Sequence, residues 1–351
     1  MYESFYRLNG KPFQLSPNPH FYFGSRGHQK AMAYLKYGLN QGEGFIVITG
    51  DVGTGKTTLL RYLLEQLDSN KYLAATLVTT QLEADDTLRM VASAFGIDAR
   101  GIDKATLLRN FERFLLESQR HGKRALVLID EVQNLPMKSL EELRMLSNFQ
   151  MSDVAPIQFC LLGQPQFQGM LASDELMQLR QRVIASYHLG PLNPDETRAY
   201  IEHRLQLVDW KSDPILTGSA YASIHRNSGG VPRRINVLCD RLLLGGMLEE
   251  LHEITGETVD SVAAEMSVEG IGAGLTNDRR DTEVKETAAP HSGSNDTRGL
   301  ESRLASVERL VLVHDRTIKR ALDVVASYLN SCSTAQSPDR ASDVAPRERG
   351  S

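Results

Sequence analysis

Residues 50–57 read GDVGTGKT, with three glycines and a Lys-Thr pair directly after an apolar run. The spacing fits G-x-x-x-x-G-K-[ST], a loop that wraps around a polyphosphate. Glycines let the backbone turn its amide N–H groups inward, and a following helix points its positive N-terminal end at the same place. The apolar run FIVIT (45–49) precedes the loop and the amphipathic TTLLRYLLEQL (57–67) follows it. This strand–loop–helix order predicts a phosphate-binding loop rather than a simple glycine-rich turn.

Two residues of the loop are expected to bind the ligand through their side chains. Lys56 is expected to reach the β and γ phosphates, and the Thr57 hydroxyl is expected to bind Mg²⁺. The sequence therefore predicts ATP and Mg²⁺ as ligands, although base specificity cannot be read from the loop. The predicted nucleotide-binding residues are Gly50, Asp51, Val52, Gly53, Thr54, Gly55, Lys56, Thr57 and Thr58.

Apolar runs alternate with helix-period stretches around this loop. Both faces of each run are apolar, which is typical of parallel strands covered by helices. The pattern predicts an α/β core with a parallel five-stranded sheet over residues 41–191, preceded by a linker and short helix at 1–40. The five expected strands are FIVIT (45–49), YLAATLV (72–78), ALVLI (125–129), IQFCLL (157–162) and VIASYHL (183–189).

The strand pattern stops near residue 193. Asn193 is a plausible N-cap, with Pro194 at the first helical position and acids in the first turn. Further helices are expected at 217–227, 232–250 and 256–265, so residues 192–266 are predicted to form a small all-helical domain. The remaining chain is predicted to be a flexible linker at 267–299, a heptad, coiled-coil-like helix at 300–331 and a disordered tail at 332–351.

An acid pair follows the third expected strand in RALVLIDEVQNL. Asp130 lies 74 positions after Lys56, at a strand end where its carboxylate can hold Mg²⁺. Glu131 is the next residue and can act as the general base that activates water. An acid pair can also simply cap a helix, but the upstream phosphate loop favours the catalytic interpretation.

Three further candidates carry weaker signals. Gln164 ends the fourth expected strand and could orient the attacking water, or could only form a turn. Arg182, with Arg180 as second choice, could reach a neighbouring subunit's nucleotide or be part of a solvated basic pair. Arg233 could point back at the phosphates from the helical domain or belong to a simple helix cap. Tyr22 and Phe23 could cover the base, with core packing an equally good alternative.

Composition and the motifs that the sequence lacks limit the possible partners, cell compartment and metal sites. The net charge of −5 does not favour nucleic acid as the main partner. Three widely spaced cysteines and the lack of a signal pattern predict a cytoplasmic protein with reduced thiols. The apolar runs are too short to span a bilayer, so any contact with the inner membrane is expected to pass through a partner. There is no HExxH or paired Cys/His spacing, so a zinc site is not expected.

With these features in order, the chain resembles the AAA+ ATPases. More narrowly, it is similar to the general-secretion-pathway A-type (ExeA-like) group, and within it to the secretion ATPases of exosortase/PEP-CTERM loci. The resemblance covers residues 1 to about 265. The segments most specific to this family are PF-x-L-S-P-x-P-x-F-Y (12–22) and PLNPDET (191–197). It also rests on GFIVITGDVGTGKTTLLR, LVLIDEVQNLP, LLGQPQF, LRQRV and SGGVPRRINVLCD.

The resemblance implies roles for the matched positions. Gly50 to Thr58 would be the Walker A loop, and Asp130 and Glu131 the Walker B pair. Gln164 would be sensor 1, Arg182 the arginine finger and Arg233 sensor 2. It also implies homo-oligomers, often rings, and a protein partner in a secretion or polysaccharide-export complex. Longer members carry a transmembrane helix and a cell-wall-binding module where this chain has its polar linker and heptad helix.

Three functions fit the sequence. The leading hypothesis is Mg²⁺-dependent ATP hydrolysis by an oligomeric AAA+ ATPase that energises or regulates an envelope secretion, exopolysaccharide or protein export system. The second is a DNA-binding AAA+ partner of a transposase (TniB/IstB-like), which the acidic charge disfavours. The third is a non-hydrolysing switch that works through its heptad helix, and Glu131 argues against it.

Overall fold

The computed structural model describes residues 1–78, 86–148 and 155–269 of the chain. All of the described residues lie within one compact unit. The predicted heptad helix and tail, and all of the predicted linker beyond residue 269, lie outside the described residues.

A parallel five-stranded sheet forms the centre of the first half of the chain, which confirms the predicted fold class. The strand order is β2-β3-β4-β1-β5, and every neighbouring pair is parallel. β1, which leads into the glycine-rich loop, therefore lies between β4 and β5. The strands are β1 (Phe45–Gly50), β2 (Tyr72–Val78), β3 (Arg124–Asp130), β4 (Ile157–Gly163) and β5 (Val183–Leu189).

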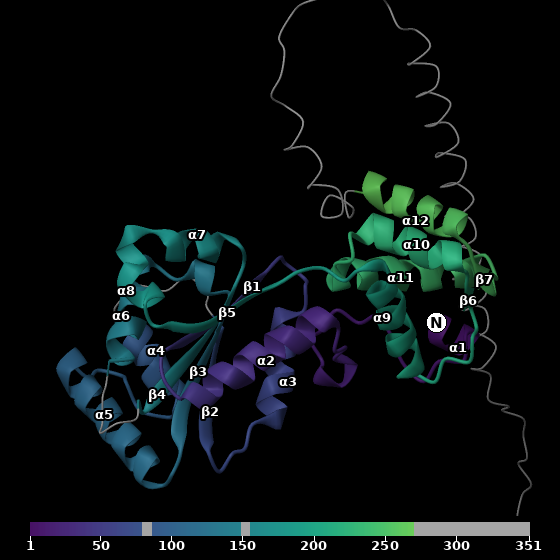
Figure 1. Cartoon of the computed structure of the whole chain (residues 1–351). Helices are drawn as coiled ribbons and strands as arrows, with labels where there is room; N and C mark the ends of the chain where they lie inside the picture. The colour runs from purple at the N-terminus through teal and green to yellow at the C-terminus, as the bar shows by residue number, and fades with distance from the viewer. Residues whose placement is uncertain (79–85, 149–154, 270–351) are drawn as a thin grey trace, which may run out of the picture. The chain divides into compact units, whose positions relative to one another are not determined.

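Helices cover both faces of this sheet (Figure 1). Phe45 and Val47 of β1 pack into one buried cluster, and Ile46 and Ile48 pack into another, because successive side chains of a strand point to opposite faces. The first cluster takes residues from α4 to α8 and the second from α2 and α3. These helices are α2 (Arg26–Gln41), α3 (Lys56–Gln66), α4 (Asp86–Ala94), α5 (Lys104–Arg120), α6 (Met137–Leu146), α7 (Gln166–Ala172) and α8 (Met177–Arg180).

The last part of the described chain, from about residue 192 to residue 269, is a small helical region, which we call the lid. Asn193 caps its first helix as predicted, and it forms a reciprocal capping box with Glu196. The prediction that this region is all-helical is wrong in one detail, because the two-residue strands β6 and β7 pair in parallel. The lid contains α9 (Pro194–Gln206), β6 (Ile215–Leu216), α10 (Gly218–Ser228), α11 (Pro232–Leu248), β7 (Glu253–Ile254) and α12 (Gly256–Val268).

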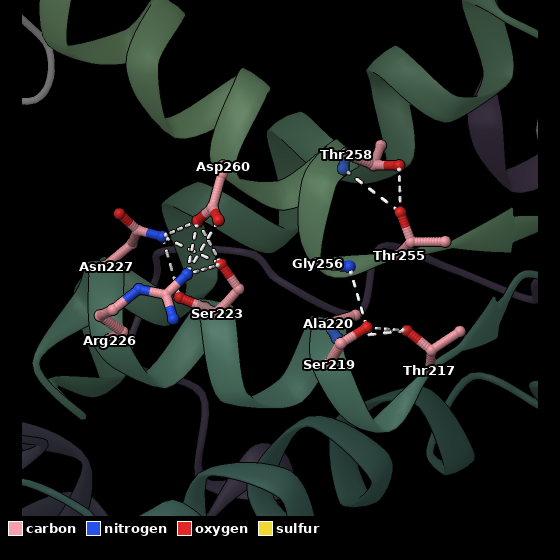
Figure 2. Close-up of polar contacts among 10 residues, drawn as sticks. All are labelled: Thr217, Ser219, Ala220, Ser223, Arg226, Asn227, Thr255, Gly256, Thr258 and Asp260. Atoms are coloured by element: carbon pink, nitrogen blue, oxygen red, sulfur yellow. Dashed lines mark hydrogen bonds and ion pairs between the residues drawn. The ribbon is translucent and has the colours of Figure 1, made fainter.

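Each short lid strand leads into a helix that opens with Thr-Gly (Figure 2). Thr217 and Thr255 accept hydrogen bonds from backbone N–H groups in the first turns of α10 and α12. Ser219 accepts a bond from the Gly256 N–H at 3.2 Å, which joins the two helix starts. One turn further on, Asp260 binds Arg226 and Asn227. The two strand–helix units are therefore joined along their length.

The N-terminal segment packs on the lid, although the lid follows it by almost two hundred residues. Tyr2 and Tyr6 are buried in the same cluster as the lid helices. The Tyr2 hydroxyl donates to Asp240 at 2.5 Å, and the Tyr6 hydroxyl donates to the Leu251 carbonyl at 3.0 Å. This segment contains α1 (Tyr2–Phe5) and a 3₁₀ turn at Pro19–Phe21. The division of the chain at residues 40, 191 and 266 stays a prediction.

Candidate functional site

The glycine-rich loop joins the end of β1 to the first residue of α3, as its sequence predicts. Gly53 and Gly55 have φ angles of 85° and 99°, which disfavour residues with a side chain. A Cβ at Gly53 would lie 2.5 Å from Cβ of Arg233, and one at Gly55 would lie 2.8 Å from Nε2 of His28. The two glycines therefore let the loop pack closely against the lid and α2.

Lys56 is the first residue of α3 and is only 5% exposed. Its Nζ donates to the carbonyls of Gly50 at 2.7 Å and Asp51 at 2.9 Å. Burial lowers the pKa of this ammonium group, and the carboxylates of Glu131, Asp130 and Asp51 act in the opposite direction. The loop thus holds one buried cation beside the N-terminal end of a helix, where anions bind favourably.

The predicted metal-binding pair lies where α3 meets the end of β3. The Thr57 hydroxyl donates to Asp130 Oδ2 at 2.6 Å, and Asp130 Oδ1 accepts the Glu131 N–H at 2.9 Å. A hydroxyl and a carboxylate are the hard oxygen ligands that Mg²⁺ prefers, with water and phosphate oxygens completing its shell. Within the described ranges there is no group of three or more His, Cys, Asp or Glu side chains that could hold a metal alone. The pair therefore fits a metal that arrives with a phosphate ligand.

Glu131 and Gln164 are brought together, and a third side chain joins them. Glu131 has a left-handed backbone with φ of 54° at the start of a 3₁₀ turn, Val132–Asn134. Its Oε2 accepts hydrogen bonds from Gln133 Nε2 at 2.6 Å and from Gln164 Nε2 at 3.1 Å. Gln133 Oε1 in turn accepts the Gln164 N–H at 3.0 Å. Sequence reasoning missed Gln133, although its place two residues after Glu131 in DEVQ is a usable signal.

The two candidate arginines lie in different surroundings. The Arg233 N–H donates to the Gly53 carbonyl at 3.1 Å, and its side chain packs over that glycine. Arg182 lies before β5, and its Nη1 is 3.4 Å from the Ser147 carbonyl. Arg233 lines the same pocket as the glycine-rich loop, whereas Arg182 is not among the residues that line it.

A pocket of about 270 Å³ extends from the loop between the N-terminal segment and the lid. Tyr22 and Phe23 line it, and the Tyr22 ring stacks on Tyr62 with centroids 3.9 Å apart. The lid wall contains residues that sequence reasoning did not assign, because they are spread over separate helices. These lid residues are Leu192, Tyr200, Arg204, Pro232 and Asn236.

His28, on α2, was also missed by sequence reasoning. Its ring packs against Gly55 of the glycine-rich loop. His28 is 6% exposed, and its Nδ1 lies 2.7 Å from the Ser25 hydroxyl. Burial lowers the pKa of His28 to about 4, so the ring is neutral at pH 7. The local signal that could have identified His28 is a serine N-cap three residues before a histidine, as in Ser25–His28.

Comparison with known proteins agrees with this geometry. Residues 39–171 match the family model described as an AAA domain. This part of the chain is an AAA domain. General secretion pathway protein A of Aeromonas hydrophila is 40% identical over 268 residues, which are 76% of this chain and 49% of that protein. The chain thus spans about half the length of this relative, and the predicted resemblance to the secretion-pathway A-type ATPases is confirmed over the matched residues.

Solved structures support the AAA fold. The ORC2 protein of Aeropyrum pernix, in ADPNP–ADP complexes, has a TM-score of 0.56 at 17% identity, covering 73% of this chain and 72% of that one. Cdc6p from Pyrobaculum aerophilum has a TM-score of 0.57 at 16% identity, covering 72% and 70%. At these identities the likeness concerns the fold alone. Within the described part of this AAA chain, no helix is long and apolar enough to cross a membrane.

Proposed function

We propose that this AAA protein binds Mg-ATP and hydrolyses it to ADP and phosphate. One observation carries the proposal: at the end of β3, Asp130 bonds the Thr57 hydroxyl of the glycine-rich loop, while the next residue, Glu131, has its carboxylate fixed by two amides. Phosphate-binding, metal-binding and proton-accepting groups therefore meet at one edge of the sheet.

The chain's own residues suit the steps of hydrolysis. The loop amides and the Lys56 ammonium bind the phosphates, and Thr57 and Asp130 would hold Mg²⁺. When bound, Mg²⁺ neutralises charge on the β- and γ-phosphate oxygens. Glu131 orients a water molecule toward the γ-phosphorus and accepts its proton as the new P–O bond forms and the bond to the β-phosphate oxygen breaks. Gln133 and Gln164 hold the Glu131 carboxylate in place for this role.

Binding and turnover can be tested separately. Calorimetry with Mg-ATP should show binding by the full chain and none by Lys56→Ala. Glu131→Gln should bind ATP with unchanged affinity and lose at least a hundredfold in turnover, because an amide cannot accept the proton. Normal ATP binding by Lys56→Ala, or normal turnover by Glu131→Gln, would show that the site is misassigned.

We also propose that Arg182 acts in the site of a neighbouring subunit. Its position outside the pocket of its own chain is consistent with this role, and an arginine supplied in trans stabilises transition-state charge. Arg182→Ala and Glu131→Gln should each be inactive alone. Mixing them should restore activity, because a subunit with intact Glu131 then meets a neighbour with intact Arg182. A mixture as inactive as its components would contradict the role in trans.

The secretion-pathway relative and the family resemblance support a proposal for the cellular role. We infer that hydrolysis energises or regulates an envelope secretion or export system through a protein partner. The relative's name and the net charge of −5 favour this role over the transposase partner. Pull-down with the ATP-trapping Glu131→Gln variant should enrich envelope-export components relative to Lys56→Ala. Salt-sensitive duplex DNA binding in a gel-shift titration would instead support the DNA-binding alternative.

A further inference from the structure

One charged side chain in the pocket wall has no part in the hydrolysis chemistry. Arg204, on α9, lines the pocket and is only 4% exposed. Its guanidinium lies over Phe21, 4.7 Å from the ring centroid, and 5.5 Å from that of Tyr200. The Arg204 side chain therefore forms part of an aromatic wall of the pocket with Phe21 and Tyr200.

The hydrogen-bonding capacity of Arg204 is largely unused. In the described part of the chain, Arg204 donates one long hydrogen bond, from Nη1 to the Gln14 carbonyl at 3.4 Å. Its buried Nε has no hydrogen-bond partner among the described residues. Burying a guanidinium without a carboxylate partner is costly, and burial holds the pKa of Arg204 below its ordinary value. A ligand acceptor in the pocket would relieve this cost.

Asn236 presents a second set of donors on the same wall. It is 7% exposed and lines the pocket from α11. Its Oδ1 accepts the Tyr200 hydroxyl at 2.8 Å, which fixes the amide and leaves the Nδ2 hydrogens for another acceptor. Two neighbouring lid side chains, Arg204 and Asn236, thus offer hydrogen-bond donors beside the rings of Phe21 and Tyr200.

These donors lie away from the phosphate end. Arg233 touches Gly53 of the loop, and Asn236 follows three residues later, about 4.5 Å further along the helix axis. Tyr200 bonds Asn236, and Arg204 follows Tyr200 by one helical turn. With the triphosphate on the loop, the nucleoside would extend toward Arg204. Aromatic rings beside a few fixed donors are typical of sites for flat heteroaromatic groups.

We propose that Arg204 and Asn236 donate hydrogen bonds to ring-nitrogen acceptors of the nucleobase, so that the lid selects a purine. This inference rests on the proposed function, because the triphosphate must occupy the loop. A purine offers more ring-nitrogen acceptors and a larger stacking face than a pyrimidine. Since both donors belong to the lid, base recognition also holds the lid against the bound nucleotide.

The test compares three ligands with the full chain. Calorimetry is run with Mg²⁺ and ATP, CTP or inorganic tripolyphosphate, on wild type and on Arg204→Met, which keeps the apolar stem. We expect Arg204→Met to weaken ATP binding about tenfold and to reduce the preference for ATP over CTP. Affinity for tripolyphosphate, which has no base, should not change.

Two further variants make the test decisive. Arg198→Met, on the same helix, removes a 60%-exposed guanidinium paired with Glu202 and should leave all three affinities unchanged. Asn236→Ala should also weaken ATP binding. If Arg204→Met does not unfold cooperatively, so that its fold is in question, the result for Asn236→Ala decides whether the lid donors contact the base.

Two outcomes would overturn the proposal, and a third would overturn the function on which it rests. Unchanged ATP binding by both Arg204→Met and Asn236→Ala would show that neither side chain contacts the base. Equal weakening of ATP and tripolyphosphate would assign Arg204 to the phosphates or to folding. Wild type that bound neither ATP nor tripolyphosphate would instead overturn the proposed function itself, so the two failures are distinguishable.

Discussion

Glu131 is positioned by its backbone as well as by its side-chain partners. A non-glycine residue with φ of 54° costs on the order of 1 kcal/mol, and the 3₁₀ turn that follows keeps it in this conformation. Its carboxylate accepts from Gln133 and Gln164, which leaves few directions in which it can rotate. The backbone and the two amides therefore hold the Glu131 carboxylate in one orientation, as its proposed role requires.

The first prediction concerns Gln133. Replacing it with Leu removes the 2.6 Å bond to Glu131 and the bond that accepts from Gln164. We expect ATP turnover to fall about tenfold, because the base is less well oriented, with ATP affinity unchanged. Steady-state hydrolysis and calorimetry measure the two effects. Gln206→Leu, at an exposed lid position, is the matched control. A parallel loss of affinity and turnover would point to a disrupted fold.

The second prediction concerns pH and His28. Burial lowers its folded-state pKa to about 4, from an ordinary value near 6.5. The unfolded chain therefore binds a proton at this residue below about pH 6.5 that the folded chain does not bind, and stability falls as the pH falls. From pH 7 to pH 5 this residue alone should cost about 2 kcal/mol. Urea unfolding at both pH values should show a smaller loss for His28→Gln than for wild type, and equal losses would contradict the assignment.

At the scale of elements, capping decides where the lid helices begin. The Asn193 side chain accepts the Glu196 N–H at 2.8 Å, and Glu196 Oε2 accepts the Asn193 N–H at 3.1 Å. Glu196 Oε1 also accepts the Arg26 N–H at 2.9 Å, so the same carboxylate reaches the first turn of α2. The cap of the first lid helix thus also joins the lid to α2, which packs on the five-stranded sheet.

The third prediction follows from this double role. Asn193→Ala should lower the free energy of unfolding by about 1 kcal/mol, the usual cost of a lost N-cap. Glu196→Ala should cost more, because it removes the bond to Arg26 as well as half of the capping box. Glu202→Ala, which breaks a pair with Arg198 and a hydrogen bond with Tyr221, both within the lid, should cost less than Glu196→Ala. Chemical denaturation gives all three values, and equal effects of Glu196→Ala and Glu202→Ala would contradict the coupling.

The elements also show what the sequence could and could not reveal. All five core strands were predicted, because buried parallel strands leave continuous apolar runs separated by helical periods. β6 and β7 were missed because two residues are too short for any period to appear. The glycine-rich loop and the acid pair were visible as contiguous motifs, and their roles stay predictions. Arg204 and Asn236 were not visible, since they meet in space from separate helices.

At the scale of the molecule, the lid depends on the beginning of the chain. Tyr2, Tyr6 and Leu8 are all less than 8% exposed and pack in the lid cluster. Further along, Gln14 accepts from Arg204 of the lid, and Pro17 accepts from Arg61 of α3 at 2.6 Å. Residues 1–18 therefore connect the lid to the helix that begins at the phosphate loop, and they border the pocket between them.

The last prediction tests this dependence by deletion of residues 1–8. Each large side chain removed from the lid cluster gives up about 1.5–3 kcal/mol of burial, so the three buried residues together should destabilise the lid by about 5 kcal/mol. The sheet has its own clusters and should remain folded. Hydrogen exchange should therefore show lost protection in α9 and α11 and unchanged protection in α5. ATP binding should weaken more than tripolyphosphate binding, because Arg204 and Asn236 lie on the helices that lose protection. Unchanged exchange in α9 and α11 would show that the lid folds without the N-terminal segment.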